Sequence, residues 1–164
     1  MKKILILFAF FYIISCSNIQ NITKETKVID CPRVFFSSEK NIFIEGNNED
    51  IDLDTIEYKA SLNNYGFAGE CTSGVNFNKF ILEILIVTEP INPKTNNINL
   101  PIFVLVYDRE NKLIDKHYFR IVDSLFFNNL SNKYDITEVI GNLNVITSLE
   151  NEVGSMTVGF VTLN

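Results

Sequence analysis

The sequence of 164 residues lacks an apolar run long enough to cross a membrane, and it contains only one histidine. The longest apolar run, residues 4–14, reaches about 16 Å as a helix at roughly 1.5 Å per residue, well short of a hydrocarbon core of roughly 30 Å. No permanent transmembrane helix is therefore predicted. His117 has no second histidine beside it, and no G-x-S-x-G motif is present, so we expect neither an enzyme nor a bound cofactor.

Basic residues are also scarce, with 14 Lys and Arg against 20 Asp and Glu. Two of the lysines, Lys2 and Lys3, precede the apolar run, and without them 12 basic residues face the same 20 acidic ones, a formal charge of −8. Binding to phosphates needs clustered Lys and Arg. The total charge therefore argues against nucleic acid as a partner and against charge-driven adhesion to anionic lipid.

What the N-terminus does contain is the pattern of a bacterial lipoprotein signal peptide. Two lysines supply the positive start, residues 4–14 supply the apolar segment, and Ser15 places a small residue directly before Cys16. Residues 13–16 resemble the lipobox, with Ile in place of the usual Leu at its first position. The pattern predicts cleavage before Cys16 and lipidation of that cysteine, whose acyl chains hold the protein on the membrane. The alternative is an ordinary secretory signal that happens to carry a cysteine near its end.

The signal divides the chain into three predicted parts. Residues 1–15 form the signal-peptide helix, residues 16–30 the lipidated cysteine and a flexible polar tether, and residues 31–164 a single folded domain. Ser17 follows the lipidated cysteine, where the best-known sorting rule has Asp for retention in the inner membrane. We therefore expect the inner leaflet of the outer membrane, with the domain facing the periplasm.

Once Cys16 is assigned to lipid, Cys31 and Cys71 remain as an even pair. In an oxidising periplasm this pair is expected to form a disulfide, and closing a loop of about forty residues stabilises a fold by roughly 3 to 4 kcal/mol. The alternatives are two free buried thiols or a metal-binding pair. The metal version lacks the further Cys or His ligands that zinc needs.

The domain has the pattern of β-structure throughout. Residues 55–62 alternate almost strictly between apolar and polar, as in a half-buried antiparallel strand, and residues 102–107 and 113–122 predict a hairpin with a five-residue connection. Further strands are predicted at 33–37, 41–45, 75–88, 134–140, 143–148 and 156–163, with turns at 63–66 and 141–142. Seven to eight strands without an amphipathic helix predict an all-β fold, an immunoglobulin-like antiparallel β-sandwich, with an eight-stranded barrel as the alternative.

Three aspartates alternate in an acidic segment: Asp50, Asp52 and Asp54. They are weak candidates for a calcium site. Thr55 stands where an EF-hand needs glycine and Ser61 where it needs a bidentate Glu, so that motif is absent. We expect a solvated acidic loop.

Two ionisable residues fall inside apolar strands. His117 has Asp115 two residues before it, an arrangement that is more often structural than catalytic. Glu83 interrupts a long apolar strand and is expected either to face solvent or to pair with a base such as Arg120.

One feature hints at an interaction. Sandwich strands normally alternate, yet residues 84–87 and 102–107 are apolar on both faces. Either another chain covers that outer face, or the composition is biased toward isoleucine. We expect a structural or protein-interaction module that is held to the membrane by lipid on Cys16 and that binds an envelope protein or a second copy. A small-ligand or calcium-binding lipoprotein is the alternative.

Over roughly residues 31–163 the sequence resembles a family of small, uncharacterised lipoproteins of alphaproteobacteria. The motifs that carry the resemblance are Cys31-Pro32, the Tyr58 strand that leads to Cys71, residues 103–108 with 115–119, and Val158-Gly159-Phe160. The resemblance implies lipidation at Cys16, pairing of Cys31 with Cys71 and a sandwich-like domain. That family has no assigned activity, so no catalytic or binding residue is implied.

Overall fold

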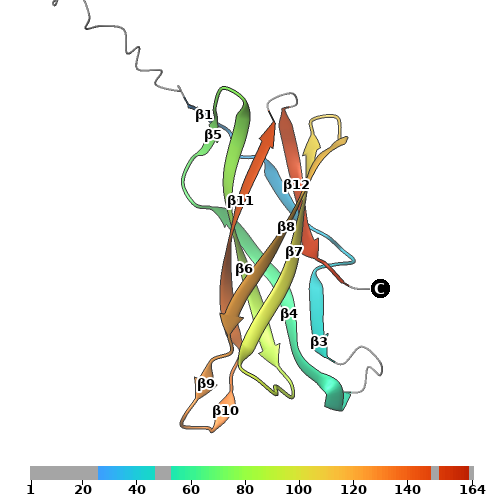
Figure 1. Ribbon diagram of the computed structural model, residues 1–164, viewed down its shortest axis with the longest axis vertical. Helices are drawn as coiled ribbons and strands as arrows, with labels where there is room; N and C mark the ends of the chain where they lie inside the picture. The colour runs from blue at the N-terminus through green and yellow to red at the C-terminus, as the bar shows by residue number, and fades with distance from the viewer. Residues whose placement is uncertain (1–25, 47–52, 149–151, 163–164) are drawn as a thin grey trace, which may run out of the picture.

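The structure is a computed structural model of the full chain, in which residues 26–46, 53–148 and 152–162 are described (Figure 1). These residues form twelve strands and one turn of 3-10 helix, η1 (Leu53–Thr55), and none of them lies in an α-helix. The strands are β1 (Lys27–Ile29), β2 (Arg33–Phe36), β3 (Ile42–Gly46), β4 (Ile56–Phe67), β5 (Cys71–Ser73), β6 (Phe77–Pro90), β7 (Asn97–Asp108), β8 (Leu113–Ser124), β9 (Phe127–Asn128), β10 (Lys133–Tyr134), β11 (Thr137–Ser148) and β12 (Val153–Phe160). In this described part of the chain, no helix is long and apolar enough to cross a membrane.

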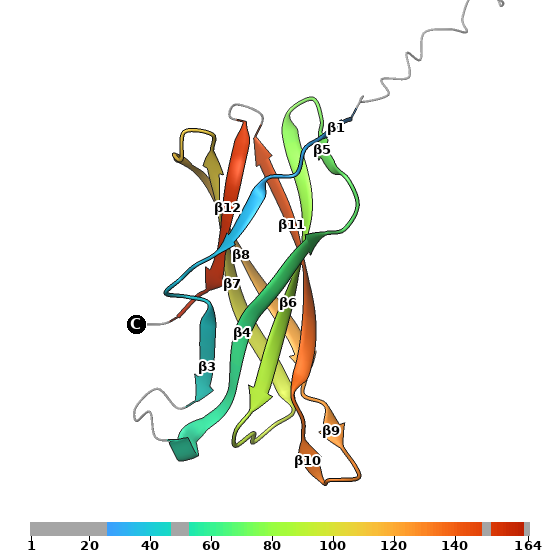
Figure 2. The ribbon, with the colours of Figure 1, turned by 180° about the vertical axis from the view of Figure 1, so that it is seen from behind.

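The long strands form two sheets that pack against each other (Figures 1 and 2). In the six-strand sheet, β6 has β11 on one side and β4 and β5 on the other, while β3 borders β4 and β1 borders β5. The four-strand sheet has the order β2-β12-β7-β8, with β2 parallel to β12 and the other neighbours antiparallel. The predicted all-β sandwich is therefore confirmed. It has more strands than the seven to eight predicted, since β1, β5, β9 and β10 are too short to give an alternating pattern.

Alternation along the long strands builds the core. From residue 78 to residue 88 of β6, buried side chains alternate with half-buried ones, and β4, β7 and β11 follow the same period. A strand turns successive side chains to opposite faces, so one set from each sheet meets between the sheets. The largest fully buried side chains are Phe80, Phe160, Leu82, Ile84, Ile86, Ile98, Leu100, Ile102, Leu143, Met156, Val104 and Val106. Removal of this apolar surface from water is the main stabilisation of the domain.

The predicted hairpin of residues 102–122 is confirmed, and the pairing of β7 with β8 extends from Asn97 opposite Ser124 to Tyr107 opposite Leu113. Its connection is fixed by Asp108, whose carboxylate accepts hydrogen bonds at 2.9 Å from the backbone N–H groups of residues 110 and 112. Such side-chain bonds to the backbone two or more residues ahead are what makes Asp a turn residue.

Two predicted turns lie inside strands, so those predictions are wrong. β4 continues through residues 63–66 because a bulge between Leu62 and Asn64 takes up an extra residue. β11 continues through Gly141, where an added Cβ would lie 2.1 Å from Cδ1 of Ile121. The absence of a side chain at Gly141 lets Ile121 of β8 approach β11 closely, and such close approach is one reason for glycine within a strand.

Cys31 and Cys71 form the predicted disulfide, with their Cα atoms 5.3 Å apart. Cys71 lies in β5 of the six-strand sheet, and Cys31 lies in the connection from β1 of the same sheet to β2 of the four-strand sheet, so the bond ties this connection to the six-strand sheet. Regular structure begins before the predicted boundary at residue 31, because β1 pairs with β5 and places Ile29 opposite Cys71. The predicted signal peptide and residues 16–25 of the predicted tether lie outside the described residues.

Candidate functional site

The candidate site lies on the outer face of the four-strand sheet. Along β7, fully buried residues that point into the core alternate with half-buried residues that point outward. The apolar run at residues 102–107 therefore contributes to both faces. The outward residues are Phe103, Leu105 and Tyr107.

Strand pairing gathers further apolar side chains around those of β7. Phe103 lies opposite Tyr118 of β8, and Thr157 of β12 separates Leu105 from Phe35 of β2. Tyr118 is 68% exposed and Phe35 is 55% exposed. The outward apolar residues between Phe35 and Tyr118, which we call the aromatic face, are Phe35, Phe103, Leu105, Tyr107, Leu113 and Tyr118, and Val122 lies further along β8 opposite Asn99.

A glycine shapes the centre of this face. Gly159 of β12 lies opposite Phe103, and a Cβ added at Gly159 would lie only 2.4 Å from Cζ of Phe103. Gly159 is buried although it lies on the outward side of β12, because the phenyl ring covers it. An aromatic ring laid over a cross-strand glycine is a known way to stabilise such a position. Because Gly159 has no side chain, the outer surface of the sheet does not project at this position.

The charged residues of the same face are all basic and exposed: Arg33, Lys116 and Arg120. In the described paired stretches of β2, β12, β7 and β8, none of the outward residues is Asp or Glu. This face is thus cationic, although the chain has 20 acidic and 14 basic residues. The charge of one face depends on which side chains point toward it, so the net charge of the chain does not predict it.

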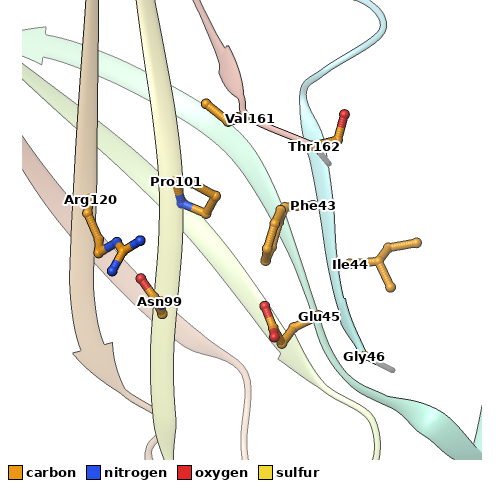
Figure 3. A pocket seen from close by; sticks show the side chains of 9 residues that line it. All are labelled: Phe43, Ile44, Glu45, Gly46, Asn99, Pro101, Arg120, Val161 and Thr162. Atoms are coloured by element: carbon orange, nitrogen blue, oxygen red, sulfur yellow. The ribbon is translucent and has the colours of Figure 1, made fainter. Parts of the chain in front are cut away.

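A pocket of about 400 Å³ lies at one end of the aromatic face, where β12 ends and β3 stands beside β7 (Figure 3). Its lining comes from β3, β7, β8 and the two residues that follow β12. We call it the β3–β7 pocket. Segments far apart in the sequence meet here because β12 ends at Phe160, so the residues of β7 before Ile102 have no β12 neighbour on that side.

Contacts between the two sheets fix the walls of the pocket. The Phe43 ring packs against Phe160 with 5.6 Å between ring centroids. The Tyr58 hydroxyl accepts a hydrogen bond at 3.0 Å from the backbone N–H of Asn99 and donates one at 3.3 Å to its carbonyl oxygen. Burial raises the pKa of this hydroxyl, so it stays protonated and keeps its donor role.

Three polar side chains line the pocket. In Figure 3 the Arg120 guanidinium and the Glu45 carboxylate are turned toward β7 from opposite sides, and the oxygen of the Asn99 side chain is turned toward Arg120. Burial raises the pKa of the Glu45 carboxyl group, and the nearby charge of Glu57 raises it further. Within the described part of the chain, neither Glu45 nor Arg120 makes an ion pair.

Of the described residues predicted as sites from the sequence, Cys31 and Cys71 come together in the disulfide. Cys16, Asp50 and Asp52 lie outside the described residues, and Asp54 is exposed in η1. Among the residues that the structure describes, no three His, Cys, Asp or Glu side chains are placed to hold a metal ion.

His117 and Glu83 lie in different parts of the sandwich, in β8 and β6. Nε2 of His117 lies 3.2 Å from Oδ2 of Asp115 but has no partner with hydrogen-bond geometry, and the imidazole stacks beside Phe119. Glu83 is half-buried on the outward side of β6. Because Arg120 lies on the outer face of the opposite sheet, the pair with Arg120 that was one of the two alternatives for Glu83 does not form.

A second exposed apolar feature is the β9–β10 hairpin, which projects from the end of the sandwich away from β1 (Figures 1 and 2). Its two strands are held by an edge-to-face contact between Phe127 and Tyr134, with ring centroids 5.1 Å apart. Leu130 at its tip is fully exposed.

The comparisons with family models, with curated proteins and with solved structures gave no match. The apolar pattern at residues 102–107 did signal an exposed face, but sequence reasoning missed the β3–β7 pocket. Its polar residues lie far apart in the chain, at Glu45, Asn99 and Arg120, and no motif links them.

Proposed function

We propose that the protein is an envelope lipoprotein, anchored through Cys16 in the inner leaflet of the outer membrane, whose domain binds an acidic protein partner and has no enzymatic role. The signal-peptide pattern of residues 1–16 supports the anchor. The aromatic face supports the partner, because the outward charged residues in the described paired stretches around it are all basic.

The composition of the aromatic face fits a protein interface. Tyr, Phe and Arg are enriched at the centres of such interfaces, where they supply large contact areas and hydrogen bonds. Exposed Lys and Arg around an apolar centre select a partner of opposite charge and speed its association. The partner is therefore expected to present acidic residues around an apolar patch.

A second copy of the chain fits this face less well. In a two-fold symmetric dimer the same patch meets itself, so the basic residues of one aromatic face would oppose those of the other. Like charges placed against each other in this way disfavour the pairing.

A lipid surface also fits less well. Side chains that insert into a bilayer must reach roughly 5–10 Å into the boundary between headgroups and acyl chains. The three residues of β7 at the centre of the face are half-buried in the sheet, and Phe103 lies over Gly159. A surface of this shape matches another protein surface better than it matches a bilayer.

Site-specific crosslinking in the envelope tests the partner. Benzoylphenylalanine replaces Tyr118 in the full-length protein, and the matched control carries it in place of Ile140, which is 62% exposed on the outer face of the other sheet. We expect a discrete protein adduct from position 118, with its yield reduced about tenfold by Lys116→Glu together with Arg33→Glu. Equal adducts from both positions, or adducts with lipid alone at position 118, would contradict the proposal.

The anchor has its own test. Cys16→Ser removes the thiol that receives the acyl chains, so we expect loss of acylation and of cleavage by the lipoprotein peptidase. Metabolic labelling with a fatty acid measures the first effect and electrophoretic mobility the second. Normal acylation of the variant would refute the lipoprotein assignment.

A further inference from the structure

We propose that the β3–β7 pocket binds a small zwitterionic molecule of the amino acid class, with its anionic group at Arg120 and its cationic group at Glu45. This site is separate from the proposed protein interface, although Arg120 borders both. The inference does not depend on the membrane anchor.

Two side chains of opposite charge line the pocket. Glu45 comes from β3 of the six-strand sheet and Arg120 from β8 of the four-strand sheet, and both line the same pocket (Figure 3). No ion pair joins these two residues, although both are described in the structure. Two opposite charges that face one space without contact leave both available to a ligand that carries both signs. Charge-assisted hydrogen bonds to carboxylate and guanidinium groups are among the strongest in proteins.

The remaining lining provides apolar surface, one amide and the hydroxyl of Thr162, which accepts a hydrogen bond from Nζ of Lys40. The Phe43 ring and Pro101 form apolar walls, and the side chain of Asn99 has no hydrogen-bond partner among the described residues. Phe43 cannot turn away freely, because it packs against both Phe160 and Tyr58. Mostly apolar walls with a few convergent polar groups are typical of small-molecule sites.

The size of the pocket limits the ligand. Its volume of about 400 Å³ lies at the lower end of the range for small-molecule sites, roughly 300–1,000 Å³. This suits a single small molecule and leaves no room for a folded segment of another protein. A ligand with only one charge would leave either Glu45 or Arg120 without a partner, at a cost in affinity.

Direct titration of the full-length protein in detergent micelles tests the site. The probes are the individual common L-amino acids, with acetate and methylammonium as ligands of one charge, and ligand-observed NMR reports the dissociation constants. We expect at least one amino acid to bind at or below about 1 mM and both single-charge probes to bind at least about tenfold more weakly, since a hydrogen bond to a charged group contributes roughly 1.5–3 kcal/mol.

Matched variants assign the charges. Arg120→Gln and Glu45→Gln are each expected to weaken binding at least about tenfold, while Arg33→Gln and Glu89→Gln, outside the pocket, change it less than about twofold. Thermal unfolding establishes that each variant is folded. Glu45→Gln should leave the crosslink from position 118 intact, so failure at this site is distinguishable from failure of the proposed interface.

Three outcomes would overturn the inference. They are the absence of binding by every amino acid at 10-fold the expected dissociation constant of about 1 mM, acetate binding as tightly as the best amino acid, and unchanged binding in folded Arg120→Gln. The second outcome would reduce the pocket to a site for anions.

Discussion

The two outer faces of the sandwich share the same alternating period but differ in charge. On the six-strand sheet, the outward residues of β6 carry both signs, with Lys79 and Glu83 set among Ile81 and Leu85. β11 adds Glu138 on the same side. On the four-strand sheet, the outward charges of the paired stretches are basic only, and aromatic residues surround them.

This difference in charge predicts that the two faces behave differently toward other proteins. Mixed charges on an exposed sheet face favour solubility and oppose association. Charges of one sign around aromatic residues favour a partner of the opposite sign. An acidic chain can therefore present a cationic surface, and its total charge is a poor guide to what that surface binds.

The disulfide ties the connection between β1 and β2 to β5, and its removal should have the largest effect on stability. In Cys31→Ala with Cys71→Ala, we expect the free energy of unfolding to fall by about 3 to 4 kcal/mol, because the unfolded chain regains the freedom of a loop of 40 residues. Denaturant titration measures the loss. Wild-type protein in reductant should show the same loss, and an unchanged midpoint in both would contradict the prediction.

Replacing a buried polar residue on the inner side of the six-strand sheet is expected to raise the free energy of unfolding. The buried hydroxyl of Thr88 has no hydrogen-bond partner in the described structure. Thr88→Val keeps the shape and removes the polar group, so we expect a rise of about 1 kcal/mol in the free energy of unfolding. Thr157→Val, on the half-buried outward side of β12, is the control and should change it less. A loss of stability in Thr88→Val would indicate a buried water bonded to the hydroxyl.

Glu45 borders the cationic face and should make stability depend on pH. Its carboxyl pKa is raised by burial and by Glu57, and the other groups that face it are Tyr58 and Arg120. Because the carboxyl pKa is higher in the folded than in the unfolded state, the neutral carboxyl group stabilises the fold at pH values below the unfolded-state pKa. This stabilisation is lost as the pH rises through the folded-state pKa. Glu45→Gln should therefore match the wild-type melting temperature near about pH 4 and exceed it by a small amount at about pH 7. A difference of the opposite sign at neutral pH would show that Arg120 dominates.

A pair of surface substitutions with the smallest expected effect on stability compares the two outer faces most directly. Tyr118→Ser and Ile140→Ser each replace an exposed residue, so both should change the free energy of unfolding by less than about 0.5 kcal/mol. We expect only Tyr118→Ser to reduce association with the partner, measured by co-purification from detergent-solubilised envelopes. Equal loss in both variants would remove the distinction between the faces.

Local patterns were sufficient for much of the fold. The strand at residues 56–62 and the hairpin of β7 and β8 follow from alternation and turn chemistry, which act over a few residues. The predicted turns at 63–66 and 141–142 failed because long-range contacts outweigh local preference. A bulge keeps β4 in register with β6, and Gly141 is needed where Ile121 crosses it.

The sequence by itself determined the all-β class and the presence of apolar residues on both sides of β7, since both depend on short periodic patterns, and the cysteine count favoured the pairing of Cys31 with Cys71. Only the tertiary structure decided which residues share a surface. The aromatic face and the β3–β7 pocket depend on strand order and register, and a shift of one residue in register would turn every side chain of a strand to the other face.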